Sequence, residues 1–213
     1  MFGLMARGAI VFTTLLMMIG CSTVKSLRPL APGQVAVQSS LVGVFLHEDV
    51  FYGAAQPAIG ARYGLTDTVE LRGHIHPATW VSSVVSGDMG VVWHGPRLGA
   101  LRFHGALDTW WLTDPGADTR ALRGIVNGEG LVHWEANRWL WVFGALNGGI
   151  AFDDGDFVPG AGIGAQFMFG RWELAVESKL AAFDESTRDF SQPFIGVAGR
   201  GILYGGIGVG YRL

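Results

Sequence analysis

Polar and apolar residues alternate strictly along much of this chain, and this alternation limits its possible folds more than any other feature. Over 68–76 the odd positions carry Val, Leu, Gly and Ile, whereas the even positions carry Thr, Glu, Arg and His. The final segment, 203–213, repeats the pattern with glycines along much of one face. Successive side chains of a β-strand point to opposite faces, so the pattern predicts strands with one apolar and one polar face. No apolar run after Gly33 approaches the length of a transmembrane helix, and the predicted fold is therefore all-β.

Ten such segments follow one another, and the lengths of their connections alternate. The segments are 34–46, 57–65, 68–76, 87–94, 98–112, 120–134, 138–152, 158–169, 171–183 and 191–213. Short connections are expected at Thr66-Asp67, Gly95-Pro96-Arg97, Glu135-Ala136-Asn137 and Gly170, and long ones at 47–56, 77–86, 113–119, 153–157 and 184–190. We therefore predict an antiparallel up-and-down transmembrane β-barrel of about ten strands (range roughly 8–12), with both chain ends on the short-turn side.

The first residues differ from the rest of the chain. Residues 1–20 carry one charge, Arg7, before an apolar stretch over 9–19, which is typical of a secretory signal peptide. Met18-Ile19-Gly20-Cys21 then resembles the lipobox of bacterial lipoproteins. That resemblance implies cleavage before Cys21 and lipidation of its thiol, and Ser22 resembles a residue that directs sorting to the outer membrane. The predicted organisation is a signal peptide at 1–20, a lipidated tether at 21–33 and a barrel domain at 34–213.

Two further segments resemble bacterial outer-membrane β-barrel proteins. Residues 61–71 read ARYGLTDTVEL, which is similar to a hairpin common in those families. The end of the chain, 204–213, resembles their C-terminal insertion signal, although it closes on Leu213 where that signal usually has Phe. The resemblance implies location in the bacterial outer membrane, with the lipid anchor on the periplasmic side. It also implies passage through the barrel-assembly and lipoprotein-sorting machineries, and contact with outer-membrane lipids and lipopolysaccharide.

The composition favours a barrel whose apolar face meets lipid. Charged residues make up 15% of the chain, against roughly 25% in typical soluble domains, and lysine occurs only at Lys25 and Lys179. Aromatic residues are expected in two belts, as in the girdles of membrane barrels. The short-turn belt consists of Tyr63, Trp93, Trp134, Phe169 and Trp172, and the loop belt of Trp111, Phe152, Phe157, Phe183 and Phe190.

A water-soluble, lipocalin-like barrel with its apolar face inward is the alternative, and here it would be a carrier tethered by its lipid. The segment 138–152 does not discriminate between the two faces. Trp139, Trp141 and Phe143 alternate there with Leu140, Val142 and Leu146.

The polar face of the segments is expected to line the bore. Its members are Arg62, Glu70, Arg72, His74, His76, Asp88, Arg102, His104, Asp108, Arg123, Asn127, Glu129, His133, Glu173, Glu177, Lys179 and Arg212. Buried charges need partners, so the simplest interpretation is a network of ion pairs that fills the bore. A narrow, charge-lined pore for small solutes is the alternative, because a barrel of this size leaves a narrow gap at most.

Metal binding has weaker support. His74, His76, Asp88, His94 and His104 are candidate ligands. Extended strand geometry separates His76 from His94 by roughly 20 Å, so one ion cannot bind them all and only His76 with Asp88 remains a candidate pair. The acidic loop Asp153-Asp154-Gly155-Asp156 is a candidate, with Asp184, Glu185 and Asp189, for divalent ions that bridge lipopolysaccharide.

No feature of the sequence specifies a catalytic centre. Ser178 lies on the apolar face of its segment without a histidine on that face, so a lipid-modifying enzyme is only an alternative. The glycines at 160, 162 and 164 precede no helix, which argues against a nucleotide-binding loop, and no cofactor is expected. The net charge of −3 and the lack of a basic stripe argue against binding to nucleic acid. We therefore expect a non-enzymatic outer-membrane β-barrel lipoprotein with a structural or surface-interaction role.

Overall fold

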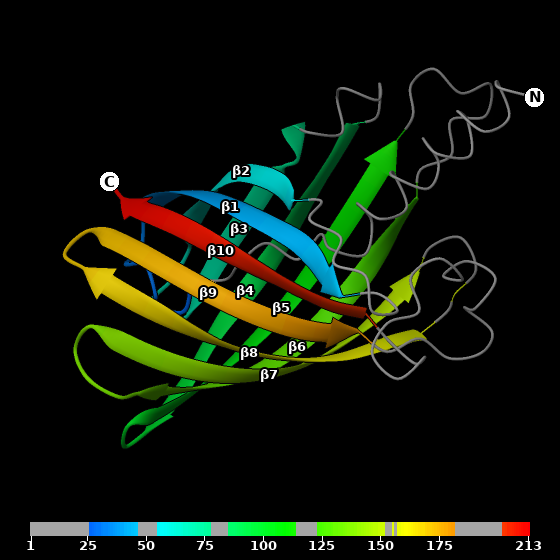
Figure 1. The fold of residues 1–213 in the computed structure, drawn as a ribbon. Helices are drawn as coiled ribbons and strands as arrows, with labels where there is room; N and C mark the ends of the chain where they lie inside the picture. The colour runs from blue at the N-terminus through cyan, green and yellow to red at the C-terminus, as the bar shows by residue number, and fades with distance from the viewer. Residues whose placement is uncertain are drawn as a thin grey trace, which may run out of the picture.

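Ten antiparallel strands close into one barrel in the computed structural model, which describes residues 26–46, 55–77, 85–113, 123–151, 155, 157–181 and 202–213 (Figure 1). The strands are β1 (Val35–Leu46), β2 (Ala55–Gly64), β3 (Val69–Ile75), β4 (Val85–Leu98), β5 (Leu101–Thr113), β6 (Arg123–Glu135), β7 (Leu140–Ala151), β8 (Phe157–Phe169), β9 (Trp172–Ala181) and β10 (Ile202–Arg212). Each strand pairs with its neighbours in sequence, and β1 pairs with β10 to close the barrel. The predicted fold class is confirmed. Among the described residues there is no helix long and apolar enough to span a membrane.

The connections alternate in length as predicted, and the short turns lie at the same end of the barrel as the C-terminus (Figure 1). Gly99 and Gly170 have positive φ angles of 63° and 64° in the two tightest turns, a conformation that glycine adopts without strain. The turn predicted at Gly95-Pro96-Arg97 is wrong, because β4 continues to Leu98 and the chain reverses at Gly99. The pairing shifts between His94 and Arg97, so Pro96 lies in an irregular part of the ladder, where its missing N–H is tolerated.

The two faces of the barrel have opposite polarity. On β3, Glu70, Arg72 and His74 are buried, whereas Leu71 and Ile75 are exposed on the outside. The same alternation settles the faces of β7, where Phe143 is buried and Val142 and Leu146 are exposed. The outer surface is therefore apolar and the interior is ionic, which is the reverse of a water-soluble barrel.

Exposed aromatic residues surround the short-turn end. Large exposed fractions are found for Tyr63, Trp93, Trp134, Phe169 and Trp172. At the other end Phe157 is exposed and Trp111 is half-buried, whereas Phe152, Phe183 and Phe190 lie outside the described residues. The start of the predicted final segment, 191–201, also lies outside them.

Residues 26–33, part of the segment 21–33 that the sequence assigns to the lipidated tether, lie inside the barrel. Leu27 and Leu30 are only 3% and 1% exposed. Gly33 donates a backbone hydrogen bond to Gly64 at the short-turn rim (2.8 Å), after which the chain continues into β1. We call residues 26–33 the N-terminal plug. The sequence offered no local signal for it, because its partners lie on strands distant in sequence.

Candidate functional site

Four charged side chains form a buried cluster near the short-turn end of the bore, which we call the short-turn cluster: Arg62, Glu70, Glu173 and Arg212. They project inward from β2, β3, β9 and β10. Arg212 donates to Glu173 from Nε (2.6 Å) and from its guanidinium NH2 group (2.5 Å), and Arg62 approaches Glu173 at 3.4 Å. Arg62 also pairs with Glu70 at 3.5 Å. Two cations and two anions therefore neutralise one another in the interior, as buried charges require.

The N-terminal plug is held by this cluster. The backbone N–H of Leu30 donates to Oε1 of Glu70 (2.6 Å), and that of Leu27 donates to Oε1 of Gln166 (2.7 Å). Arg212 donates to the carbonyl oxygens of Arg28 (3.0 Å) and Pro29 (3.3 Å). These bonds satisfy backbone groups that would otherwise be buried without partners. They attach the plug to the inner face of the barrel.

Further contacts fix the deeper end of the plug. The Ser26 hydroxyl bonds to Glu173 and accepts from the Gln166 amide (2.9 Å). The carbonyl of Ser26 accepts from Arg62 (3.2 Å). Leu27 packs in a buried apolar cluster with Leu131 and Phe143. The plug thus combines ionic and apolar contacts.

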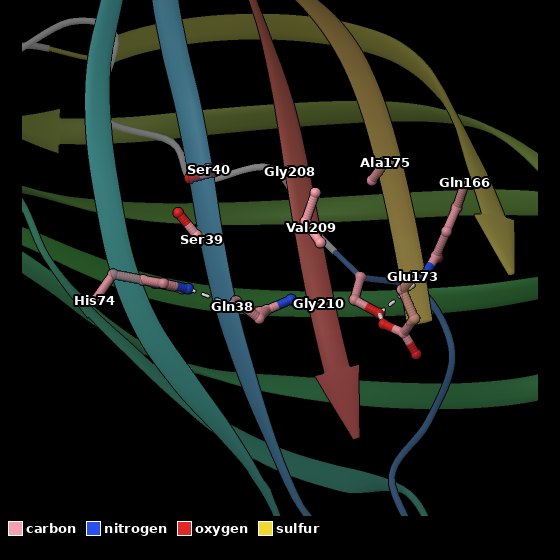
Figure 2. A pocket seen from close by; sticks show the side chains of 11 residues that line it. Gln38, Ser39, Ser40, His74, Gln166, Glu173, Ala175, Gly208, Val209 and Gly210 are labelled. Atoms are coloured by element: carbon pink, nitrogen blue, oxygen red, sulfur yellow. Dashed lines mark hydrogen bonds between the residues drawn. The ribbon is translucent and has the colours of Figure 1, made fainter. Parts of the chain in front are cut away.

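Two small cavities lie beside the plug among the described residues. Figure 2 shows the cavity next to Gln38, His74 and Glu173, and its volume is about 10 Å³. A second cavity, between Ser26 and Arg72, is of the same size. Each has room for about one water molecule. Neither leaves a path for a solute at this level of the bore.

A chain of three imidazoles leads away from Glu70, and we call His94, His104 and His133 the histidine chain. Nε2 of His94 lies 2.7 Å from Oε1 of Glu70, and its Nδ1 lies 2.8 Å from Nδ1 of His104. Nε2 of His104 lies 2.6 Å from Nδ1 of His133. His133 stacks on Trp141, with ring centroids 4.5 Å apart, and its Nε2 is 3.5 Å from Glu135.

Two further sets of charged side chains in the bore form ion pairs. Arg72 binds Asp108 through two hydrogen bonds. Lys179 lies 2.9 Å from Glu177 and 3.7 Å from Glu129. The first pair joins β3 to β5, Lys179 and Glu177 lie two residues apart on β9, and the contact of Lys179 with Glu129 joins β9 to β6.

A histidine–aspartate group accounts for the candidate metal ligands. Both carboxylate oxygens of Asp88 are taken by imidazoles, Oδ1 by Nδ1 of His74 (2.8 Å) and Oδ2 by Nε2 of His76 (3.1 Å). His94 and His104 belong to the separate histidine chain. Within the described residues, no three His, Cys, Asp or Glu side chains come together in a way that could hold a metal ion.

The structure gives the following positions for the residues expected to line the bore. The buried ones are Arg62, Glu70, Arg72, His74, His76, Asp88, His104, Glu129, His133, Glu173, Glu177, Lys179 and Arg212. Arg102, Asp108 and Asn127 are half-buried. The Arg123 side chain, Cys21 and most of the acidic loop lie outside the described parts of the chain. Ser178 is on the opposite side of the wall from the five described histidines, all of which are buried inside.

Sequence reasoning missed Ser26 and Gln166, and it did not connect His94 to the other two histidines. Gln166 is fully buried, and its place among the inward-facing positions of β8 was a usable signal. The bond between His94 and His104 follows from their direct pairing in the β4–β5 ladder, which a misplaced turn concealed.

An open hollow lies at the short-turn mouth, beside the plug. Its volume is about 590 Å³, and it is lined by Arg28, Arg97, Glu135, Asn137, Arg138, Trp141, Met168 and Gly170. Arg97 and Glu135 form an ion pair at 2.5 Å on its rim. Because Glu135 and Trp141 also contact His133, the hollow adjoins the outer end of the histidine chain.

The closed sheet and its inverted polarity define a class, the architecture of a ten-stranded transmembrane β-barrel. No protein-family model matches the chain, and no curated protein matches it in sequence. Among solved structures it is similar to the NanC porin, with 13% identity over 84% of this chain and 100% of that chain and a TM-score of 0.42. It is also similar to the outer membrane protein Ail of Yersinia pestis, with 11% identity over 85% of this chain and 99% of that chain and a TM-score of 0.41. A third similar structure is the translocator domain of the autotransporter NalP from Neisseria meningitidis, with 12% identity over 86% of this chain and 90% of that chain and a TM-score of 0.43. Structural similarity this weak gives no information about what the chain binds or does.

Proposed function

We propose that this protein is a non-enzymatic outer-membrane β-barrel lipoprotein whose bore is closed, with a structural or surface-interaction role. In this proposal the barrel is embedded in the bacterial outer membrane, lipid on Cys21 adds an anchor, and the short turns face the periplasm. The partners are outer-membrane lipids and lipopolysaccharide.

The observation that carries the proposal is the filled short-turn end of the bore. A solute pore needs a continuous aqueous path lined by solvated groups. Here the N-terminal plug occupies that path, and its backbone is bonded to Glu70, Gln166 and Arg212. The cavities beside it are of about 10 Å³. The interior therefore favours a closed barrel over a conducting one.

The outer face supports the membrane location. Leu107 in the middle of β5 and Ile163 in the middle of β8 are 58% and 69% exposed. A tethered, lipocalin-like carrier would expose such residues to water and would place its arginines and glutamates where an apolar ligand has to bind. An apolar outer face around an ionic interior is the arrangement that suits a lipid environment.

Gel migration and lipid labelling test the barrel and the anchor together. Outer-membrane fractions of wild type and Cys21→Ala are run with and without heating, after growth with labelled palmitate. We expect both proteins to shift in migration on heating, because the barrel does not depend on the lipid, and only the wild type to carry label. Recovery of the Cys21→Ala protein in the aqueous phase would favour the tethered carrier.

Conductance separates the closed barrel from the pore. We expect wild-type protein in a planar bilayer to give no stable open channel. A channel whose conductance changes in Arg102→Ala and Glu129→Ala would establish the pore instead. For the lipid-modifying enzyme, the discriminating measurement is the lipid A and phospholipid profile of a deletion strain, which we expect to match the parent.

A further inference from the structure

The protons of the histidine chain can be assigned from the hydrogen bonds that its members make. An ionised carboxylate only accepts hydrogen bonds, so His94 donates to Glu70 from Nε2 and its Nδ1 carries a lone pair. The bond between His94 and His104 then requires His104 to donate from Nδ1, which leaves Nε2 of His104 as an acceptor. His133 in turn donates to that atom from Nδ1. Every N–H of the neutral chain therefore points toward Glu70.

This assignment leaves one nitrogen bare at the other end. Nε2 of His133 carries a lone pair, has no hydrogen-bond partner among the described residues, and belongs to a side chain that is 0% exposed. Its neighbour is a carboxylate oxygen of Glu135, 3.5 Å away, which is also an acceptor. Two acceptors that face each other without a proton repel, and an unsatisfied buried nitrogen is costly. The pair therefore forms a binding site for one proton, and Glu135 opens it to the hollow at the mouth.

We propose that the histidine chain takes up a proton at the short-turn mouth and relays it to Glu70, the carboxylate that holds the N-terminal plug. The proton comes from water in the hollow and forms an N–H bond at Nε2 of His133. His133 releases its Nδ1 proton to Nε2 of His104, His104 releases its Nδ1 proton to Nδ1 of His94, and His94 releases its Nε2 proton to Glu70. One proton enters, Glu70 becomes a carboxylic acid, and each imidazole ends neutral as the other tautomer.

Charged side chains surround the histidine chain, and a carboxylate lies at each of its ends. Charged groups face it from β2 (Arg62), β3 (Glu70 and Arg72), β5 (Arg102) and β6 (Glu129 and Glu135), while β7 contributes the uncharged Trp141. Arg102 is a cationic neighbour of both His104 and His133. The two carboxylates, Glu70 and Glu135, are the anionic ends of the chain, and in the proposal Glu70 is the final acceptor.

Arrival of the proton changes how the plug is held. Ionised Glu70 accepts hydrogen bonds from Leu30 and His94 on Oε1 and pairs with Arg62 through Oε2. Protonation removes the charge from this carboxyl group and leaves Arg62 with Glu173 as its remaining anion. Hydrogen bonds to a charged acceptor are about twice as strong as those to a neutral one, so the grip on Leu30 weakens. The relay thus connects the pH at the short-turn mouth to the strength of the contact between Glu70 and the plug.

Histidine NMR tests the relay directly. The mature chain is prepared with isotope-labelled histidines in lipid nanodiscs, and the tautomer of each ring is determined from about pH 7.5 to about pH 5, the range in which histidine ordinarily titrates. At neutral pH we expect the proton on Nε2 of His94 and on Nδ1 of His104 and His133. At acid pH we expect all three tautomers to invert. A neutral-pH proton on Nε2 of His133, or no inversion in a folded barrel, would overturn the proposal.

Three variants separate a relay from a local effect. Glu70→Gln keeps an acceptor for His94 but cannot accept a proton, so we expect a persistent imidazolium in place of inversion. Glu135→Gln removes the carboxylate at the entrance and should lower the midpoint of uptake by about one pH unit. His74→Gln removes a buried histidine of the separate Asp88 group and should leave the three tautomers as in wild type. Inversion of the tautomers in Glu70→Gln would refute delivery to Glu70, whereas an unchanged midpoint in Glu135→Gln would refute entry beside Glu135.

Discussion

Glu173 shows how much a single side chain contributes to the interior of this barrel. It accepts hydrogen bonds from Arg212 and Arg62 and also contacts Ser26, so it joins two strands and the N-terminal plug. All of these groups are buried. Removing one anion from such a set leaves cations buried without compensation, which is a larger loss than the net contribution of the intact pair.

We expect Glu173→Gln to lower the free energy of unfolding by about 3–5 kcal/mol, measured by urea titration of the barrel in lipid vesicles. Arg97→Ala is the control, because Arg97 pairs with Glu135 while its side chain is 57% exposed. The loss there should stay below about 1 kcal/mol, since water and salt screen an exposed ion pair. Equal losses in the two variants would mean that the short-turn cluster is solvated.

At the scale of elements, the plug fits against β2 only because residue 64 is glycine. A Cβ atom at Gly64 would overlap the carbonyl oxygen of Ala31 and touch Leu30. The backbone of Gly64 also accepts a hydrogen bond from Gly33 of the plug (2.8 Å) and donates one to Gln34, the next residue along the chain (3.0 Å). A methyl group therefore cannot be accommodated unless the plug moves.

We expect Gly64→Ala to loosen the plug while the barrel stays closed. The measurement is the reaction of a cysteine at position 30, introduced as Leu30→Cys in a Cys21→Ser background, with a water-soluble maleimide. Overpacking of this kind costs about 1–3 kcal/mol, so the rate should rise about tenfold or more. Gly130→Ala is the matched control, since no atom lies within 4 Å of a Cβ placed there. Equal reaction rates in both variants would contradict tight packing of the plug against Gly64.

The strands were the most predictable elements, and the reason is local. On β3 each residue's face follows from its own polarity, so Glu70 and Leu71 could be assigned to the interior and the exterior without knowledge of their neighbours. The ion pairs could be anticipated as a group from the same pattern. Which carboxylate binds which guanidinium depends on register and could not be anticipated.

Two features escaped prediction because their causes are not local. Gly95-Pro96-Arg97 has the composition of a turn, but Arg97 still pairs with Arg102, and the reversal occurs at Gly99. Residues 25–33 were interpreted as a tether because the segment is polar and contains proline, and nothing in it indicates that Leu27 and Leu30 are buried. Their burial depends on partners such as Gln166, 139 residues away from Leu27.

At the scale of the whole molecule, the apolar exterior distinguishes a lipid environment from water. We expect Leu107→Arg, in the middle of β5, to destabilise the folded barrel in vesicles by about 2–4 kcal/mol. Leu98→Arg, at the short-turn rim, should cost about 0–1 kcal/mol, although Leu98 is just as exposed, at 62%. Urea unfolding in vesicles measures both. A water-soluble barrel would tolerate the two substitutions equally.

The proton relay also has a consequence for the closed barrel. When only the short-turn compartment of a planar bilayer is acidified from about pH 7.5 to about pH 5, we expect ion flow through the wild-type protein to increase. The increase should be lost in His104→Gln, which interrupts the relay, and kept in His74→Gln. Acid on the loop side alone should have little effect. An increase that persists in His104→Gln would show that the plug responds to some other group.

The contacts of Ser26 and Leu27 also constrain the order of assembly. Their partners Glu173 and Gln166 are 147 and 139 residues further along the chain, on strands that are synthesised near the end. These two contacts therefore cannot form until the last hairpins exist, and contacts of such long sequence separation form slowly. The seam between β1 and β10 depends on the same late part of the chain, so we expect completion of the wall and filling of its centre to occur close together.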